Sequence, residues 1–180
     1  MSRNSRNSCN SLNSRASRNS RTSSTGNAGR FSKEVLNKIR IKLPALSVNE
    51  GMARAAVAAF VSQLDPGVTE IADIKCAVSE AVTNAIVHGY RQAEDTGSID
   101  ITVSILAGRT VKIEIKDKGC GIPDVAMART PLFTTDAGGE RSGMGFTVME
   151  NFTDALKVSS SVGKGTTVTM WKKLSERGRI

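Results

Sequence analysis

The amino-acid sequence predicts an α/β fold of the α+β kind, a two-layer sandwich in which helices cover one face of a mixed, mostly antiparallel sheet. Alternating apolar residues indicate five short strands, at residues 38–44, 99–105, 111–115, 155–160 and 166–171. Apolar residues at three- and four-residue spacing indicate two long helices, at residues 47–64 and 69–90. Such elements bury their apolar sides by packing as layers around one core.

The first elements have recognisable start and stop signals. Apolar residues alternate with charged ones over residues 38–44, which is typical of an edge strand. Ser47 or Asn49 can cap the helix that follows, and the run from Asp65 to Gly67 ends it. The second helix is expected to begin after Thr69, where acidic residues occupy the first turn.

The second half of the chain predicts a hairpin, a long connection and a second hairpin. The turn at residues 106–109 joins the two middle strands, which are therefore antiparallel. Residues 122–142 are long for a loop inside a compact domain, so we expect a functional lid or a disordered insertion there. A short helix is expected to begin at Gly143, and the turn at residues 162–165 joins the last two strands.

The positive charge is concentrated at the start of the chain. Residues 1–33 carry seven of the 25 basic residues and no acidic one, which leaves 18 basic against 17 acidic residues in the rest. Serine recurs at every third position there, with almost no apolar side chain to offset the entropy of ordering. We expect a disordered tail at residues 1–33, one domain at 34–175 and a short tail at 176–180. The domain is nearly neutral, so we expect no direct contact with DNA.

The role of the N-terminal tail stays open. A basic, serine-rich segment can bind RNA, DNA or a protein partner, can be phosphorylated, or can be a solvated appendage. A start of translation at Val35 would leave it out of the protein.

Cysteine usage and hydropathy indicate the compartment. Cys9, Cys76 and Cys120 are odd in number and form neither a CxxC pair nor a metal-ligand spacing, which favours a reduced setting. No apolar run approaches the about 20 residues of a membrane span, and the first residues lack the apolar stretch typical of a signal peptide. We expect a cytoplasmic protein, and we assign no role to Cys120.

Three clusters of polar and glycine residues stand out, and the first lies on the second helix. Glu80, Asn84 and His88 are four residues apart, so they share one stripe of that helix. The amide oxygen of Asn84 suits Mg²⁺, and Glu80 can accept a proton from a hydroxyl. Alternatively, Glu80 pairs with a basic residue and Asn84 caps a strand. His88 is either a phosphate contact or a helix-end residue.

The second cluster follows the strand at residues 111–115. Asp117 can accept a hydrogen bond from an exocyclic amine such as that of adenine, while Gly119 and Gly121 leave room for a flat base. Thr166, on the last strand, can hydrogen-bond in the same pocket. The alternative is a turn that needs no ligand.

The third cluster contains Arg141, Gly143 and Gly145. The two glycines open a helix, where free N–H groups and the helix dipole favour an anion, and Arg141 can bind phosphate through two hydrogen bonds. A plain helix start with a surface arginine explains this segment equally well. The fixed order of the three clusters nevertheless indicates a nucleotide site without a P-loop.

One further segment looks like the end of a P-loop. It runs from Gly163 to Thr166, but the first glycine of the motif is missing and Lys164 is followed by Gly165. We interpret it as a hairpin turn.

These clusters resemble the N box and the two glycine boxes of the GHKL ATPase superfamily (Bergerat fold), which includes gyrase, Hsp90, histidine kinases and MutL. Within it, the chain is most similar to the small serine-kinase anti-sigma factors, in particular those of sporulation. The similarity extends over residues 35–174 and is strongest at residues 44–50, 79–90, 131–135 and 140–152.

The resemblance implies a homodimer that keeps a sporulation sigma factor of the sigma F type away from RNA polymerase. It also implies a kinase that uses ATP and Mg²⁺ to phosphorylate a serine of an anti-anti-sigma factor of the STAS type. Arg54, on the first long helix, would contact both protein partners.

The same resemblance assigns roles to the clusters. Glu80 would be the general base and Asn84 the Mg²⁺ ligand, and residues 122–142 would close over the nucleotide. The remaining residues would bind ATP: Asp117, Gly119, Gly121 and Thr166 around the adenine, and His88, Arg141, Gly143 and Gly145 near the phosphates.

Three alternatives remain. The chain could be a stress-type anti-sigma serine kinase with another sigma partner, a non-catalytic module that binds in an ATP-dependent way, or a nucleic-acid-binding protein that uses its tail. Intact Glu80 and Asn84 argue against the non-catalytic form. A two-component histidine kinase is disfavoured, because the single histidine, His88, lies within the N box.

Overall fold

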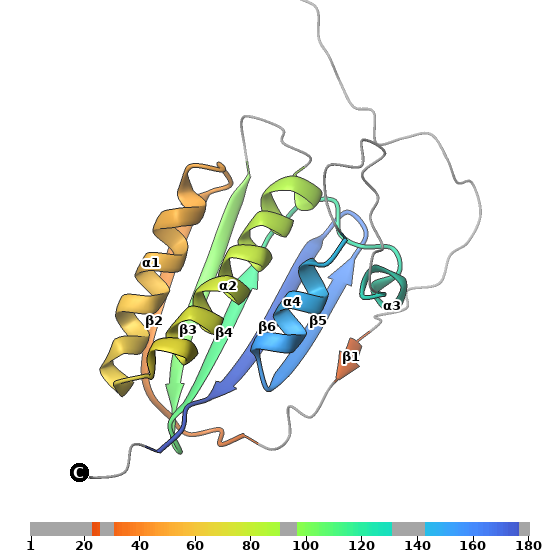
Figure 1. Cartoon of the computed structure of the whole chain (residues 1–180). Coiled ribbons are helices and arrows are strands. Elements are labelled where there is room, and N and C mark those ends of the chain that lie inside the picture. The colour runs from red at the N-terminus through yellow and green to blue at the C-terminus, as the bar shows by residue number, and fades with distance from the viewer. Residues whose placement is uncertain (1–22, 26–30, 91–96, 131–142, 177–180) are drawn as a thin grey trace, which may run out of the picture.

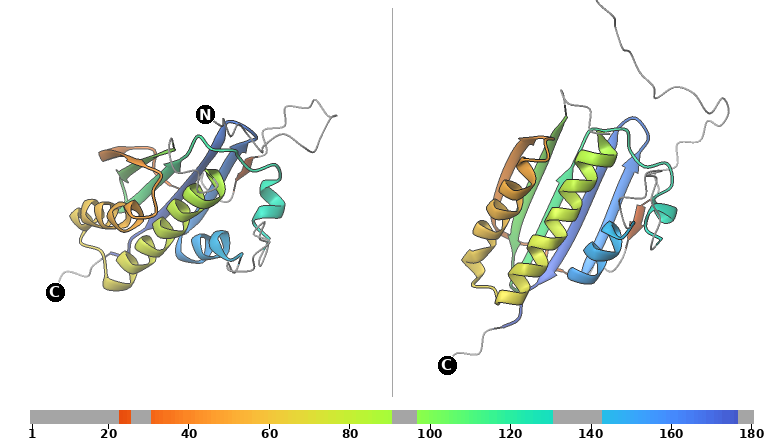
Figure 2. Two further views of the ribbon diagram at one scale, coloured as in Figure 1. Left: turned by 90° about the horizontal axis from the view of Figure 1, so that it is seen from above. Right: turned by 45° about the horizontal axis from the view of Figure 1, so that its top comes forward.

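The chain forms one antiparallel sheet with helices packed against one face (Figures 1 and 2). The computed structural model describes residues 23–25, 31–90, 97–130 and 143–176. The strand order is β1-β5-β6-β4-β3-β2. The strands are β1 (Ser23–Thr25), β2 (Val35–Pro44), β3 (Ser98–Leu106), β4 (Thr110–Lys116), β5 (Ala155–Ser161) and β6 (Gly165–Lys173).

The two-layer fold expected from the sequence is confirmed, and β2 lies at the edge of the sheet as expected. Every pair among the described strands is antiparallel. The parallel pairing that a mixed sheet implies is therefore not found in the described part of the chain. Short connections join β3 to β4 and β5 to β6, and short connections produce antiparallel neighbours.

In the described part of the chain, three α-helices cover the sheet and a fourth, short one follows β4. They are α1 (Asn49–Val61), α2 (Val68–Asn84), α3 (Val125–Ala128) and α4 (Gly145–Phe152). α1 continues as the 3₁₀ turn η2 (Ser62–Leu64), and α2 continues as the π-helical turn η3 (Ala85–Gly89). Figure 2 shows α1, α2 and α4 side by side on the same face.

The boundaries of the helices differ in detail from those expected. Neither Ser47 nor Asn49 caps α1: the cap residue is Val48, and the side chain of Asn49 instead donates a hydrogen bond to the carbonyl of Pro44. α4 begins at Gly145 and not at Gly143, because Gly143 has a φ of 64°, outside the helical range.

The start of α2 is held by Glu70. Its carboxylate accepts hydrogen bonds from the backbone N–H of Gly67 at 2.8 Å and of Ser175 at 2.7 Å. Partial burial raises the pKa of Glu70, but these hydrogen bonds and the charge of Lys172 outweigh it, so the pKa lies below its ordinary value. The carboxylate thereby ties the C-terminal segment to the first turn of α2.

The core lies between the helices and the sheet. Ile74 and Val78 on α2 are fully buried, as are Val103 on β3 and Met170 on β6. Burying an aliphatic side chain of this size stabilises a fold by about 1.5–3 kcal/mol relative to leaving it in water. The site residues on α2 are therefore carried by a helix with a firmly packed inner face.

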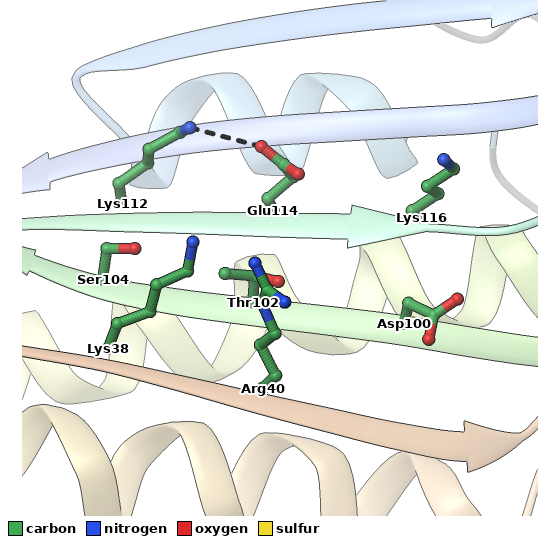
Figure 3. Close-up of a pocket in the computed structure, with 8 residues that line it drawn as sticks. All are labelled: Lys38, Arg40, Asp100, Thr102, Ser104, Lys112, Glu114 and Lys116. Atoms are coloured by element: carbon green, nitrogen blue, oxygen red, sulfur yellow. Dashed lines mark hydrogen bonds and ion pairs between the residues drawn. The ribbon is translucent and has the colours of Figure 1, made fainter.

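The opposite face of the sheet is polar along β2, β3 and β4. A hollow of about 330 Å³ lies along β2, β3 and β4. Lys112 pairs there with Glu114 at 3.2 Å, and Figure 3 shows this pair among the lining side chains. Its lining residues are Lys38, Arg40, Asp100, Thr102, Ser104, Lys112, Glu114 and Lys116. None of the three sequence clusters lies here, so this face is separate from the candidate nucleotide site.

Two of the expected mobile segments are described only in part. Residues 1–22, 26–30, 131–142 and 177–180 lie outside the described residues, so the predictions of a disordered tail and of a lid that closes stay predictions there. Within the expected tail, however, Ser23–Thr25 forms β1 and pairs with β5. β5 would otherwise be an edge strand, whose backbone groups are free to pair with an extended segment. No helix in the described ranges is long and apolar enough to span a membrane.

Candidate nucleotide-binding site

The first and third clusters meet where α2 and α4 pack together. Glu80 and Asn84 lie on the C-terminal half of α2, and Gly145 is the first residue of α4. A Cβ added to Gly145 would lie 2.9 Å from Nδ2 of Asn84 and 3.1 Å from Oε2 of Glu80. Both side chains are half-buried and face the start of α4. The helix start, the amide and the carboxylate therefore form one site.

The second cluster is anchored by a buried carboxylate. Asp117 directly follows β4, and its Oδ1 accepts hydrogen bonds from the backbone N–H of Gly119 at 2.9 Å and of Thr166 at 3.1 Å. Burial raises the pKa of Asp117 above its ordinary value, although these two hydrogen bonds oppose the shift. A carboxylate has about four lone-pair sites, so acceptor capacity remains for a ligand.

Glycines bring this cluster against the end of α2. The carbonyl of Gly89, the last residue of η3, accepts a hydrogen bond from the backbone N–H of Cys120 at 2.8 Å. A Cβ on Gly119 would overlap the same carbonyl oxygen, so only glycine allows this approach. π-helical turns are frequent at functional sites, and this one directly continues the stripe of Glu80 and Asn84.

The turn that follows is held against β5. Gly121 has a φ of 73°, and a Cβ there would overlap the carbonyl of Ser161. Gly165 packs equally closely on the carbonyl of Asp117. The glycine spacing that suggested room for a base is thus also required by the packing of the backbone itself.

Two residues that the sequence analysis did not single out organise this region. The hydroxyl of Ser160 accepts a hydrogen bond from the N–H of Ile122 at 2.7 Å and lies 2.9 Å from the hydroxyl of Thr166. The hydroxyl of Tyr90 accepts from the N–H of Lys118 at 2.8 Å and donates to the carbonyl of Ser98 at 2.7 Å. The sequence offered one sign of a role for Ser160. It is a polar residue at a position of β5 where the alternation predicts an apolar side chain that faces the helices.

Of the remaining predicted site residues, the structure describes His88 and Gly143 but not Arg141. His88 is half-buried in η3, and its carbonyl lies 3.1 Å from the thiol of Cys120, so the histidine adjoins the glycine turn. Gly143 precedes α4 in the left-handed region. Arg141 lies outside the described residues, and its phosphate contact stays a prediction.

Arg54 lies on the exposed side of α1, next to α2. Its guanidinium is 3.3 Å from Oε1 of Glu50 and 3.4 Å from the hydroxyl of Ser79, which itself donates to Glu50. Ser79 immediately precedes Glu80 in the sequence. Arg54 is therefore an exposed cation on the helix next to α2, paired with Glu50.

The donor set at the start of α4 fits a hard cation held together with a phosphate. Asn84 offers an amide oxygen and Glu80 a carboxylate, which are ligand types that Mg²⁺ accepts alongside water and phosphate oxygens. Within the described ranges no group of three or more His, Cys, Asp or Glu side chains could hold a metal by itself. A metal here would consequently depend on nucleotide phosphates for its other ligands.

Comparison with known proteins assigns the family. Residues 43–172 match the family model described as the histidine kinase-like ATPase domain. The anti-sigma F factor of Bacillus licheniformis is 51% identical over 78% of this chain and 94% of its own length. That of Clostridium botulinum (strain Eklund 17B / Type B) is 54% identical over 77% of this chain and 96% of its own. The chain belongs to the anti-sigma F factor family. The resemblance drawn from the three clusters is thereby confirmed.

Solved structures agree at the level of the fold. The RsbU and RsbW domains of Rv1364c from Mycobacterium tuberculosis have a TM-score of 0.59 and 22% identity, over 79% of this chain and 34% of that protein. Full-length ShkA, solved in complex with AMPPNP, has a TM-score of 0.50 and 16% identity, over 84% of this chain and 34% of its own. This member of the anti-sigma F factor family thus spans about a third of each, and at such identities the likeness shows the fold alone.

Proposed function

We propose that this protein is an anti-sigma factor that binds a sigma factor of the sigma F type and withholds it from RNA polymerase. We further propose that it is an ATP-dependent serine kinase that phosphorylates, and so inactivates, a STAS-type anti-anti-sigma factor. The observation that carries the kinase is the meeting of Glu80, Asn84 and the start of α4 at one point. The family assignment supports the anti-sigma role.

The chemistry requires a base, a place for phosphates and a way to neutralise their charge. The hydroxyl of the partner's serine would lose its proton to Glu80 while its oxygen attacks the γ-phosphorus of ATP, and ADP would leave. Mg²⁺, when bound, would neutralise charge on the phosphates, with Asn84 supplying one protein ligand. Backbone N–H groups at the start of α4 would bind phosphate oxygens.

The base of the nucleotide would bind around Asp117. Its carboxylate is fixed by Gly119 and Thr166 and keeps acceptor capacity for the exocyclic amine of adenine. The hydroxyl of Thr166, 2.9 Å from that of Ser160, is available in the same region. These contacts would favour adenine, which carries an exocyclic amine where guanine carries a carbonyl oxygen.

The alternatives differ in a way that one experiment separates. The purified protein is incubated with labelled ATP, Mg²⁺ and candidate anti-anti-sigma proteins, and sigma factors are captured in parallel. Transfer of label to a serine, together with capture of a sigma F-type factor, is the expected result. Capture of a different sigma factor would indicate a stress-type regulator, and capture without transfer would indicate a non-catalytic module.

The expected homodimer and the partner contact of Arg54 follow from the family resemblance. The particle mass in solution, measured with and without ATP, tests the homodimer; a monomer under all conditions would contradict it. Replacing the exposed Arg54 by Glu should weaken capture of both protein partners while nucleotide affinity stays unchanged.

A further inference from the structure

Phe31, shortly before β2, is held against the sheet by an aromatic contact. We call residues 23–34 the N-terminal arm; the structure describes its residues 23–25 and 31–34. The ring of Phe31 stacks on that of Trp171 in β6, with 6.2 Å between ring centroids and 5° between ring planes. Leu106 and Ala155 complete this small apolar cluster, which is separate from the main core.

The backbone of the arm is also fixed near this cluster. The carbonyl of Glu34 accepts a hydrogen bond from the N–H of Ala107 at 3.0 Å, immediately after β3. Phe31 is therefore brought to Trp171 by a segment that is already bound to the sheet. An offset-stacked aromatic pair contributes stabilisation beyond the area that it buries.

The start of the arm pairs with β5. Ser23 lies opposite Ser159 and Thr25 opposite Lys157, so β1 becomes the outermost strand of the sheet (Figure 1). Ala155, which contacts the Phe31 cluster, is only two residues from Lys157.

Without the arm, β5 would be an edge strand. β6 pairs with one side of β5 along its whole length, and among the described residues only β1 pairs with the other side. An open edge presents unpaired N–H and C=O groups to which another extended chain can add. Ser160 directly follows the part of β5 that pairs with β1, and its hydroxyl contacts that of Thr166. β1 also contacts α3.

We propose that the outer edge of β5 is a docking surface for an extended strand, and that the N-terminal arm of the same chain occupies it. The contact between Phe31 and Trp171 anchors the arm. Covalent connection to β2 gives the arm a high effective concentration at this edge, which favours it over a separate chain. A partner that presents an extended strand has to displace the arm to reach β5, so the arm controls access to this edge.

The first test is the variant Phe31→Ala in the full chain, with Leu36→Ala as its control. Leu36 is 60% exposed on β2 and lies outside the cluster. In F31A we expect hydrogen exchange of the outward-pointing amides at residues 157–159 to speed up about tenfold or more, because burial and stacking of the ring are lost. The emission of Trp171, the single tryptophan, should shift to the red. L36A should change neither signal.

A second variant separates the anchor from the strand. Deleting residues 1–30 keeps Phe31 but removes β1, so the amides of β5 should exchange rapidly while the emission of Trp171 stays as in the full chain. Circular dichroism verifies that both variants are folded. Equal exchange of these amides in the full chain and the deletion variant would overturn the proposal. Protection that disappears on dilution would also overturn it, because the arm would then come from a second copy.

Discussion

Gly145 lies against the side chain of Asn84 so closely that a Cβ at position 145 would stand 2.9 Å from the amide nitrogen. The contact joins the start of α4 to the C-terminal half of α2, and it includes the carboxylate of Glu80. Glycine at this position therefore does two things: it leaves the backbone accessible to an anion, and it leaves space for the two polar side chains.

Replacing Gly145 by Ala should weaken nucleotide binding with little loss of stability. The added methyl group would displace the ends of two flexible side chains and leave the backbone in place, so the site is disturbed more than the fold. We expect affinity for Mg²⁺–ATP to fall by about tenfold, equivalent to about 1.4 kcal/mol, measured by titration calorimetry. Unchanged affinity would mean that the nucleotide does not approach the start of α4.

Replacing Glu80 by Gln should abolish phosphorylation of the anti-anti-sigma partner while ATP binding persists. The amide keeps the shape of the side chain but cannot accept the serine proton, and general-base catalysis typically contributes about 10²- to 10⁴-fold. Label transfer and nucleotide affinity are measured on the same preparation. Glu114→Gln, on the polar face of the sheet, is the matched control and should remain active. Retained kinase activity in E80Q would remove Glu80 from the role of base.

Replacing Asn84 by Ala should weaken binding of ATP only when Mg²⁺ is present. The variant removes an amide oxygen that suits the metal but no group assigned to the adenine. Affinity is measured with Mg²⁺ and with a chelator, and the difference between the two should shrink in N84A. If the difference is the same as in the unmodified protein, the metal is held elsewhere.

Asp117 should make stability depend on pH with a defined sign. Burial raises its pKa in the folded protein above that of the unfolded chain, so the folded state binds the proton more tightly. Its contribution to the free energy of unfolding therefore decreases as pH rises from the ordinary carboxyl range through the raised pKa. Urea unfolding between about pH 4 and 7 should show this slope, and Asp117→Asn should remove it. Identical slopes in both proteins would contradict the assignment.

Replacing Gly119 by Ala should destabilise the fold itself. The Cβ would overlap the backbone carbonyl of Gly89, which also accepts the hydrogen bond from Cys120, and backbone cannot move aside cheaply. We expect a loss of about 1–3 kcal/mol in chemical denaturation. Gly51→Ala is the control, because nothing lies within 4 Å of a Cβ there. In the first turn of α1, this substitution should be neutral or stabilising by up to about 1 kcal/mol.

Local patterns were sufficient for the layout of the domain. Apolar residues alternate along the strands and recur every three or four residues along the helices. Both periodicities indicate which side of an element is buried, and that burial stabilises the element. Helix ends were less predictable: Val48 and not a polar residue precedes α1, and α4 starts at Gly145. End positions depend on contacts with other segments, which local patterns do not contain.

The residues that line the candidate site could be predicted from the sequence, but the residues that hold them in place by hydrogen bonds could not. Glu80, Asn84 and Gly145 were named from the sequence, and the structure brings them together. Ser160 and Tyr90 were not, because an isolated serine in a strand or a tyrosine after a helix carries no signal until its hydrogen-bond partners are known. The catalytic and ligand roles remain predictions for the experiments above.

Periodicity and motif spacing are properties of short segments, so the family, the two-layer fold and the residues of the three clusters could be derived from the sequence alone. How the clusters join became visible in the folded chain: Gly145 lies against Asn84, and Gly119 lies against Gly89. The same holds for the stacking of Phe31 on Trp171 and for the pairing of β1 with the edge of β5. These contacts join residues far apart in the chain, and they form only when the packing of the core has placed their backbones within reach.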